Sequence, residues 1–151
     1  MLDLDHRHMT PPSLALVDQR PTPAGDSVAL WHLRVAQPNI AHIPPAVVHS
    51  FEHFLIYLMA EEQGPVIAAA PMGCQTGYYI LAVNLGDFDG MAAILAEALL
   101  RITKATAVPC ATTKECGWAE NHSLSGAKDL AAWLLLHRDT WARVTTDASD
   151  D

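Results

Sequence analysis

The chain has 151 residues, half of them hydrophobic and 17% charged, which is typical of a globular protein with one sizeable core. Its formal net charge of −8 argues against nucleic acid or an anionic membrane surface as a partner. No apolar run reaches the roughly 18 residues of a membrane-spanning helix, and the N-terminus lacks the features of a signal peptide, so we expect a cytoplasmic protein with reduced cysteines.

The first half of the chain predicts two strands and a helix. A short strand at residues 13–17 lies among several prolines. Apolar and polar side chains alternate over residues 28–37, as expected for a half-buried strand. The first predicted helix spans residues 46–62, because it starts just after Pro45 and ends before Gly64.

The second half predicts two more strands and then two helices. The strands, at residues 66–70 and 78–85, are joined by a short turn, which favours antiparallel pairing. A strongly apolar helix follows at residues 91–106, with a cap from one of the aspartates just before it. The last helix is expected at residues 125–144.

Together these elements predict an α+β fold, an antiparallel sheet with helices packed on one face. We find no internal repeat and no domain boundary in the sequence. We therefore expect a single domain over residues 1–144, followed by a disordered acidic tail at residues 145–151.

Residues 49–53 form an H-x-x-E-H pattern made by His49, Glu52 and His53. On a helix, positions i and i+4 lie one turn apart on nearly the same side, so two imidazoles there can bind one ion. Glu52 projects near that side and can move protons without being a ligand. The same inverted order occurs in zinc hydrolases, so the pattern predicts a catalytic metal site, although two histidines at this spacing could also be an ordinary pair.

A third ligand must come from elsewhere in the chain. Cys116 lies in a polar turn, and two histidines with one cysteine leave a fourth position open, as in catalytic zinc sites. A mixed nitrogen and sulfur set also suits Fe(II). The competing set uses a carboxylate, Glu97 or Glu115. Taken alone, Cys116 could instead be a small buried hydrophobic residue.

Two further residues could take part in chemistry. Cys74 lies in a turn between two glycines, and a thiol near a metal or a cation has a lowered pKa and can act as a base or nucleophile. Arg34 shares a strand face with His32 and could bind a substrate oxygen or form a surface ion pair. Cys110 lacks any such context, and we expect it to be a buried structural thiol.

Several segments of the chain closely resemble the S-ribosylhomocysteine lyase (LuxS) family. The segments are LDH at residues 4–6, LRVAQPN at 33–39, HSFEH at 49–53, PMGCQTGYY at 71–79, KECG at 114–117, HSL at 122–124 and GAK at 126–128. They occur in the family's order and at similar spacings, from residue 4 to the last helix. The set is highly specific for the family.

The resemblance implies a fold like a half-unit of the H-x-x-E-H metallopeptidases and a homodimer with two active sites at the subunit interface. The cofactor would be one divalent metal, Fe(II) or Zn(II). The implied reaction isomerises the sugar of S-ribosylhomocysteine and then releases homocysteine by β-elimination, leaving 4,5-dihydroxy-2,3-pentanedione, the autoinducer-2 precursor. The implied site residues are the metal ligands His49, His53 and Cys116, the acid/base pair Glu52 and Cys74, and the sugar contacts Arg34 and His6.

One departure leaves a second function open. Ala68 stands where the family usually has an acidic residue that serves substrate binding. The chain could therefore be an isomerase or lyase that acts on a different sugar or thioether. An H-x-x-E-H peptidase would need a carboxylate ligand and would give no role to Cys74. A non-catalytic binding protein would need neither Cys74 nor Glu52.

Overall fold

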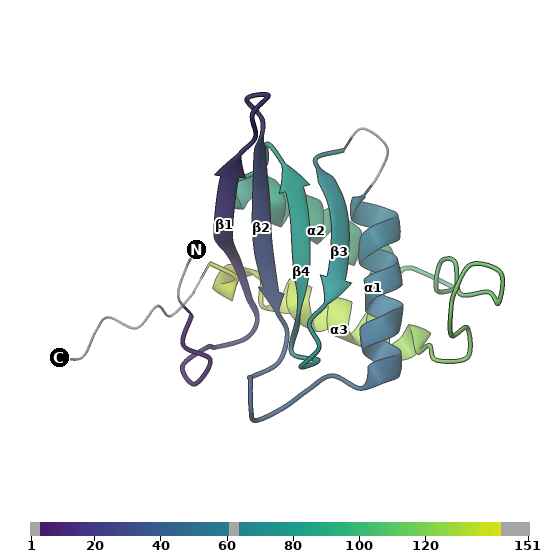
Figure 1. Ribbon diagram of the computed structural model, residues 1–151. Coiled ribbons are helices and arrows are strands. Elements are labelled where there is room, and N and C mark those ends of the chain that lie inside the picture. The colour runs from purple at the N-terminus through teal and green to yellow at the C-terminus, as the bar shows by residue number, and fades with distance from the viewer. Residues whose placement is uncertain (1–3, 61–63, 143–151) are drawn as a thin grey trace.

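The computed structural model describes residues 4–60 and 64–142. It contains one antiparallel sheet with the strand order β1-β2-β4-β3 (Figure 1). The strands are β1 Ser13–Pro21, β2 Ser27–Arg34, β3 Val66–Pro71 and β4 Gly77–Val83. The short turn between β3 and β4 makes them antiparallel neighbours, as predicted.

Three helices pack against this sheet. They are α1 Pro45–Met59, α2 Phe88–Thr103 and α3 Leu124–Leu136, and a short 3-10 turn follows at Arg138–Thr140. Prolines at the first turn of α1 set its start, since proline is preorganised for a helix and lacks only an N–H that would be unpaired there. Asp87 caps α2 by accepting a hydrogen bond from the Gly90 N–H, which confirms a cap from one of the two aspartates, Asp87 and Asp89, before the predicted helix.

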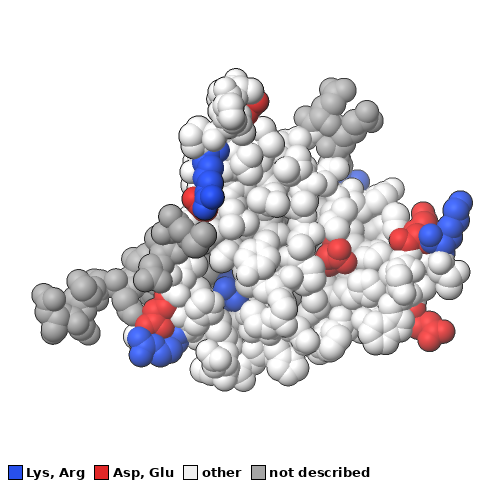
Figure 2. Space-filling model, in the orientation of Figure 1, with Lys and Arg blue, Asp and Glu red and all other residues white. Residues whose placement is uncertain are grey.

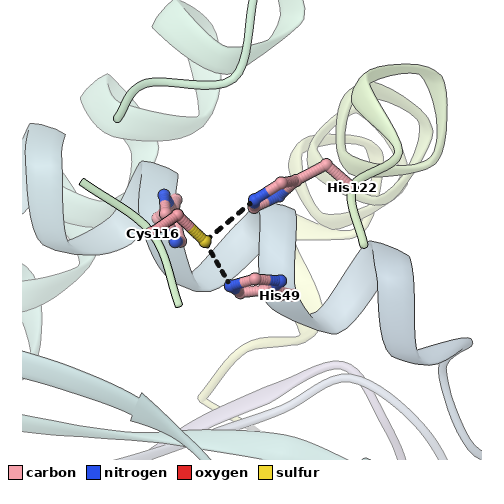
Figure 3. Close-up of side chains that lie close together, drawn as sticks. His49, Cys116 and His122 are labelled. Atoms are coloured by element: carbon pink, nitrogen blue, oxygen red, sulfur yellow. Dashed lines mark hydrogen bonds between the residues drawn. The ribbon is translucent and has the colours of Figure 1, made fainter. Parts of the chain in front are cut away.

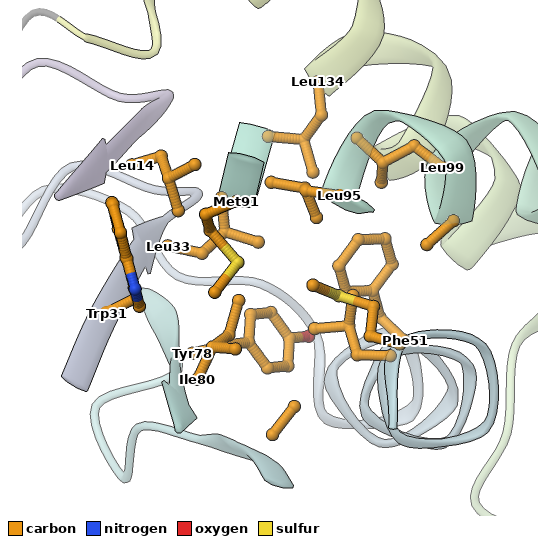
Figure 4. Close-up of a cluster of buried hydrophobic side chains, with 14 of the residues drawn as sticks. Leu14, Trp31, Leu33, Phe51, Tyr78, Ile80, Met91, Leu95, Leu99 and Leu134 are labelled. Carbon is orange, nitrogen blue, oxygen red and sulfur yellow. The ribbon is translucent and has the colours of Figure 1, made fainter. Parts of the chain in front are cut away.

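The hydrophobic core lies between the sheet and the three helices (Figure 4). Alternate residues of β2, Trp31 and Leu33, are almost fully buried and pair across to Ile80 and Tyr78 of β4. Each helix contributes side chains to the same cluster, among them Phe51, Leu95 and Leu134. All three helices therefore lie on one face of the sheet, and the predicted α+β class is confirmed.

The element bounds differ from the predicted ones at several ends. β1 continues four residues beyond residue 17, because it pairs with β2 as far as Pro21, with a bulge between Leu16 and Asp18. The last helix does not run unbroken to residue 144: α3 ends at Leu136. Residues 143–151, including the predicted acidic tail, lie outside the described part of the chain. None of the described helices has both the length and the apolar character needed to cross a bilayer.

Shortening one core side chain tests this packing. Leu95 is fully buried, so Leu95→Ala removes apolar contacts and leaves a cavity. We expect the free energy of unfolding to fall by about 2–5 kcal/mol, measured by urea denaturation. The matched control is Leu136→Ala, because Leu136 is 78% exposed; its effect should stay within about 0.5 kcal/mol. Equal losses for both variants would contradict this core.

Candidate metal centre and acid–base residues

Core residues and candidate site residues lie on different sides of helix α1. Phe51 and Leu55 are fully buried and face the core, whereas His49 and His53 are only partly buried. The two imidazoles lie one turn apart with ring centroids 4.8 Å from each other. Core packing of α1 thus fixes the direction in which both histidines project.

The other members of the cluster come from the α2–α3 loop, residues 104–123. Its Cys116 Sγ lies 3.4 Å from His49 Nε2 and 3.5 Å from His122 Nε2 (Figure 3). One ligand atom from each of His49, His53, Cys116 and His122 lies within 4.8 Å of the others. The loop therefore brings the predicted third ligand, Cys116, to the histidine pair across 63 residues of sequence.

His122 is the member of this cluster that the sequence analysis did not assign. It was recognised only as part of a segment typical of the family. The available signal was a histidine six residues after Cys116 in the same polar loop. Burial, followed by the nearby charges of His49 and His53, lowers the pKa of His122. The His122 ring is therefore harder to protonate than a free imidazole.

Backbone carbonyls fix the orientation of both α1 histidines. The Nδ1 of His49 lies 2.9 Å from the carbonyl oxygen of Asn121, and the Nδ1 of His53 lies 2.8 Å from that of Pro109. A carbonyl can only accept, so each Nδ1 carries the proton and each Nε2 keeps its lone pair. This is the usual arrangement of metal-binding histidines, and it supports a metal site.

The donor set also fits a metal ion chemically. Two imidazole nitrogens and one sulfur suit Zn(II) or Fe(II). The competing carboxylate ligands do not join the cluster: Glu115 accepts a hydrogen bond from Thr112 Oγ1 at 2.8 Å, and Glu97 lines a separate pocket with Arg101. The described residues thus favour Cys116 over either carboxylate.

Glu52 lies at the edge of this cluster. Its Oε2 is 4.0 Å from His53 Nε2, and its side chain is 23% exposed. The carboxylate therefore faces the side on which His53 offers its lone pair and remains accessible to a small molecule. That position suits a proton carrier beside the metal.

Cys74, Arg34 and Thr76 form a second group. Thr76 Oγ1 lies 3.0 Å from Cys74 Sγ and accepts a hydrogen bond from Arg34 Nη1 at 2.5 Å. Burial opposes ionisation of Cys74, but hydrogen bonds with Thr76 and the charge of Arg34 outweigh it, so the pKa of the thiol is lowered. Arg34 is only 2% exposed, which excludes the alternative of a surface ion pair.

His6 belongs to the same region as Cys74. Both line a pocket of about 410 Å³ together with Asn39, His42 and Thr76. His32, on the strand next to this region, has its pKa lowered to about 4 by burial and by the charges of Arg34 and His6. Imidazole and guanidinium groups thus lie near the thiol.

The predicted site residues therefore form two groups in this chain. One is the metal group with Glu52, and the other is the thiol group of Cys74, Arg34 and His6. No hydrogen bond or ion pair among residues 4–60 and 64–142 joins the two groups. The expectation for Cys110 was wrong: it is exposed, because the loop places it in a turn with φ +54° rather than in the core.

The environment of Cys74 predicts its reactivity. A thiol with a lowered pKa is a larger fraction of thiolate near neutral pH, so iodoacetamide should alkylate Cys74 faster than an ordinary thiol. Thr76→Val removes a stabilising hydrogen bond, so the pH midpoint of alkylation should rise. The experiment needs a Cys110→Ser background, because Cys110 is also exposed. Identical pH profiles with and without the Thr76 hydroxyl would contradict this assignment.

Comparisons with known proteins agree with this geometry. The family model described as S-ribosylhomocysteinase (LuxS) matches residues 1–145. A relative named S-ribosylhomocysteine lyase from Dichelobacter nodosus is 39% identical over 142 residues, 94% of this chain and 92% of the relative. Relatives of the same name from Listeria monocytogenes serotype 4b and Helicobacter pylori strain ATCC 700392 / 26695 are 37% and 35% identical, each over 94% of this chain and 92% of their own length. The chain belongs to the S-ribosylhomocysteinase (LuxS) family.

Proposed function

We propose that this protein is a metal-dependent S-ribosylhomocysteine lyase that releases homocysteine and 4,5-dihydroxy-2,3-pentanedione, the autoinducer-2 precursor. Membership of the family and the names of the relatives support this activity. The single observation that carries the proposal is the cluster of His49, His53 and Cys116 with Glu52 at its edge. A structural metal would not need an accessible carboxylate beside it.

His49, His53 and Cys116 would hold the metal, which we propose to be Fe(II) or Zn(II). When bound, such a metal acts as a Lewis acid that polarises the carbonyl and hydroxyl oxygens of the sugar. The role of the protein is then to fix the two imidazoles through the carbonyls of Asn121 and Pro109 and to leave one side open to substrate.

Glu52 and Cys74 would move the protons. Shifting the carbonyl from C1 to C2 and then to C3 takes a proton from the carbon beside the carbonyl and returns one to the former carbonyl carbon. Elimination removes the C4 proton and breaks the C5–S bond, and the departing homocysteine sulfur takes up a proton. The resulting C4–C5 enol gains a proton at C5 and loses its hydroxyl proton to give the dione. These transfers involve successive carbons, so two groups on different sides of the sugar serve them better than one.

Arg34 and His6 would hold the sugar. Both lie near the Cys74 pocket, and the guanidinium of Arg34 contacts Thr76. A buried guanidinium and an imidazole can hydrogen-bond hydroxyl oxygens of the substrate while the thiolate reaches its carbon-bound protons. In this proposal the thiol group supplies recognition as well as a base.

We propose a cytoplasmic homodimer in which the two groups meet across the subunit interface. No hydrogen bond or ion pair joins the metal group to the thiol group within the described part of one chain, which supports this arrangement. The sheet face opposite the helices supports it too, because charged side chains lie mainly at the margin of the view in Figure 2 and its centre is largely uncharged. Tyr79 and Ile67 are exposed hydrophobic residues on β4 and β3. The free cysteines suit a reducing compartment.

A second candidate is the same chemistry on another sugar or thioether. Ala68 of β3 is partly exposed, and its methyl group offers a substrate no hydrogen bond. Incubation with S-ribosylhomocysteine and a free-thiol assay separates the two candidates. Rapid thiol release supports the lyase, whereas metal-loaded, folded protein that releases no thiol would favour the alternative substrate.

The acid/base assignment predicts the behaviour of two variants. Cys74→Ala and Glu52→Gln should each retain the bound metal, since neither residue belongs to the ligand set. Each should lower kcat for thiol release by about 10²–10⁴-fold. Metal content by atomic absorption and thiol release are measured on the same samples, with Cys110→Ser as the control for loss of an exposed thiol. Wild-type turnover in either variant would refute that residue's role.

Mixing the same two variants tests the shared site. If Glu52 and Cys74 of one active site come from different subunits, a mixed dimer contains one intact site and one site with both changes. Random exchange of subunits should then restore about a quarter of wild-type activity. If both residues come from one subunit, the mixture should stay as inactive as its components. Subunit exchange is verified by native mass spectrometry of differently tagged chains.

A further inference from the structure

We propose that His122 is not a fourth ligand but a hydrogen-bond donor to the Cys116 thiolate, held in that role by Ser50. This inference rests on the metal site of the proposed function and adds a positioning residue to it. Distance alone does not decide the role of His122. Its Nε2 lies 3.5 Å from Cys116 Sγ, while two ligands of one tetrahedral zinc, one nitrogen and one sulfur, would lie about 3.6 Å apart.

The hydrogen bonds of Ser50 decide the tautomer of His122. The Ser50 side chain is fully buried in α1, and its Oγ accepts a hydrogen bond from the Ser123 N–H at 2.7 Å. Its own proton needs an acceptor, because an unpaired buried hydroxyl is costly. Among the described residues, the other hydrogen-bond partner of this hydroxyl is His122 Nδ1, at 3.1 Å. The hydroxyl therefore donates its proton to that nitrogen.

His122 Nδ1 must therefore be unprotonated. A ring whose Nδ1 is unprotonated carries its one proton on Nε2, which lies 3.5 Å from Cys116 Sγ. His49 and His53 have the opposite tautomer, since their Nδ1 atoms face carbonyls that can only accept. Two imidazoles thus present lone pairs to the cluster, and the third presents an N–H.

Cys116 Sγ has a second donor nearby. The Trp118 N–H lies 3.4 Å from the same sulfur, so the thiolate would accept hydrogen bonds from both Trp118 and His122. Hydrogen bonds to a ligating sulfur withdraw charge from it. The sulfur then donates less to the metal, which becomes a stronger Lewis acid. The arrangement also leaves the fourth coordination position free for substrate.

The test uses cobalt-substituted and zinc-loaded full-length protein. His122→Leu removes the donor, so the sulfur-to-cobalt charge-transfer band should move to lower energy. Zinc affinity should fall by about 10–100-fold, because the ligating sulfur also loses a contact that orients it. His122→Gln keeps an N–H at a similar reach and should restore most of both properties. Ser50→Ala frees the tautomer and should give an intermediate shift. His137→Leu is the matched control, since His137 lies outside the cluster and bonds Trp133.

X-ray absorption of the zinc-loaded protein completes the test. Two imidazoles and one sulfur in both the wild type and His122→Leu support the proposal. Three imidazoles in the wild type that fall to two in the variant would overturn it, as would an unchanged charge-transfer band. No substrate is used, so the proposed function can fail separately: a shifted band without thiol release refutes the lyase and leaves the role of His122 intact.

Discussion

The site depends on two hydrogen bonds that tie the α2–α3 loop to helix α1. Backbone carbonyls of Asn121 and Pro109 hold the Nδ1 atoms of His49 and His53, and the same loop carries Cys116. Loop position and histidine tautomer are thus set by the same contacts. A loop shifted by one residue would lose the acceptors and the sulfur together, so histidine orientation and metal binding are expected to be coupled.

Core packing also fixes α1 relative to the turn that carries Cys74. Tyr78 donates a hydrogen bond from its hydroxyl to the Val48 carbonyl and packs against Phe51, with ring centroids 5.3 Å apart. Just before α1, the Ile43 N–H donates a hydrogen bond to the carbonyl of Gln75, next to Cys74. The thiol group and the metal group therefore sit on a rigid frame, and their spacing cannot adjust independently of the core.

Local patterns predicted the helices and strands and the histidine pair of α1, and long-range contacts account for what they missed. The H-x-x-E-H spacing predicted two imidazoles on one side of α1. An aspartate just before α2 was expected to cap that helix, and Asp87 does so. His122 was missed because its role arises only when the loop folds back onto Ser50, 72 residues earlier. Burial of Cys110 was predicted from residue type alone, but a left-handed turn keeps its side chain in solvent. The hydrophobic periodicity of the sequence predicts neither the contact of His122 with Ser50 nor the exposure of Cys110.

Hydrogen bonds with Thr76 and the charge of the buried Arg34 together lower the pKa of Cys74. Arg34 is 2% exposed, and a buried guanidinium is costly unless anionic or polar partners surround it. Its Nη1 contacts Thr76 Oγ1 and Cys74 Sγ. A Cys74 thiolate offsets the buried positive charge better than a thiol, so each group favours the charged form of the other. Arg34 Nε has no hydrogen-bond partner among the described residues. Because a buried unpaired donor is destabilising, this nitrogen adds to the cost of burying Arg34, which the contacts of Nη1 must offset.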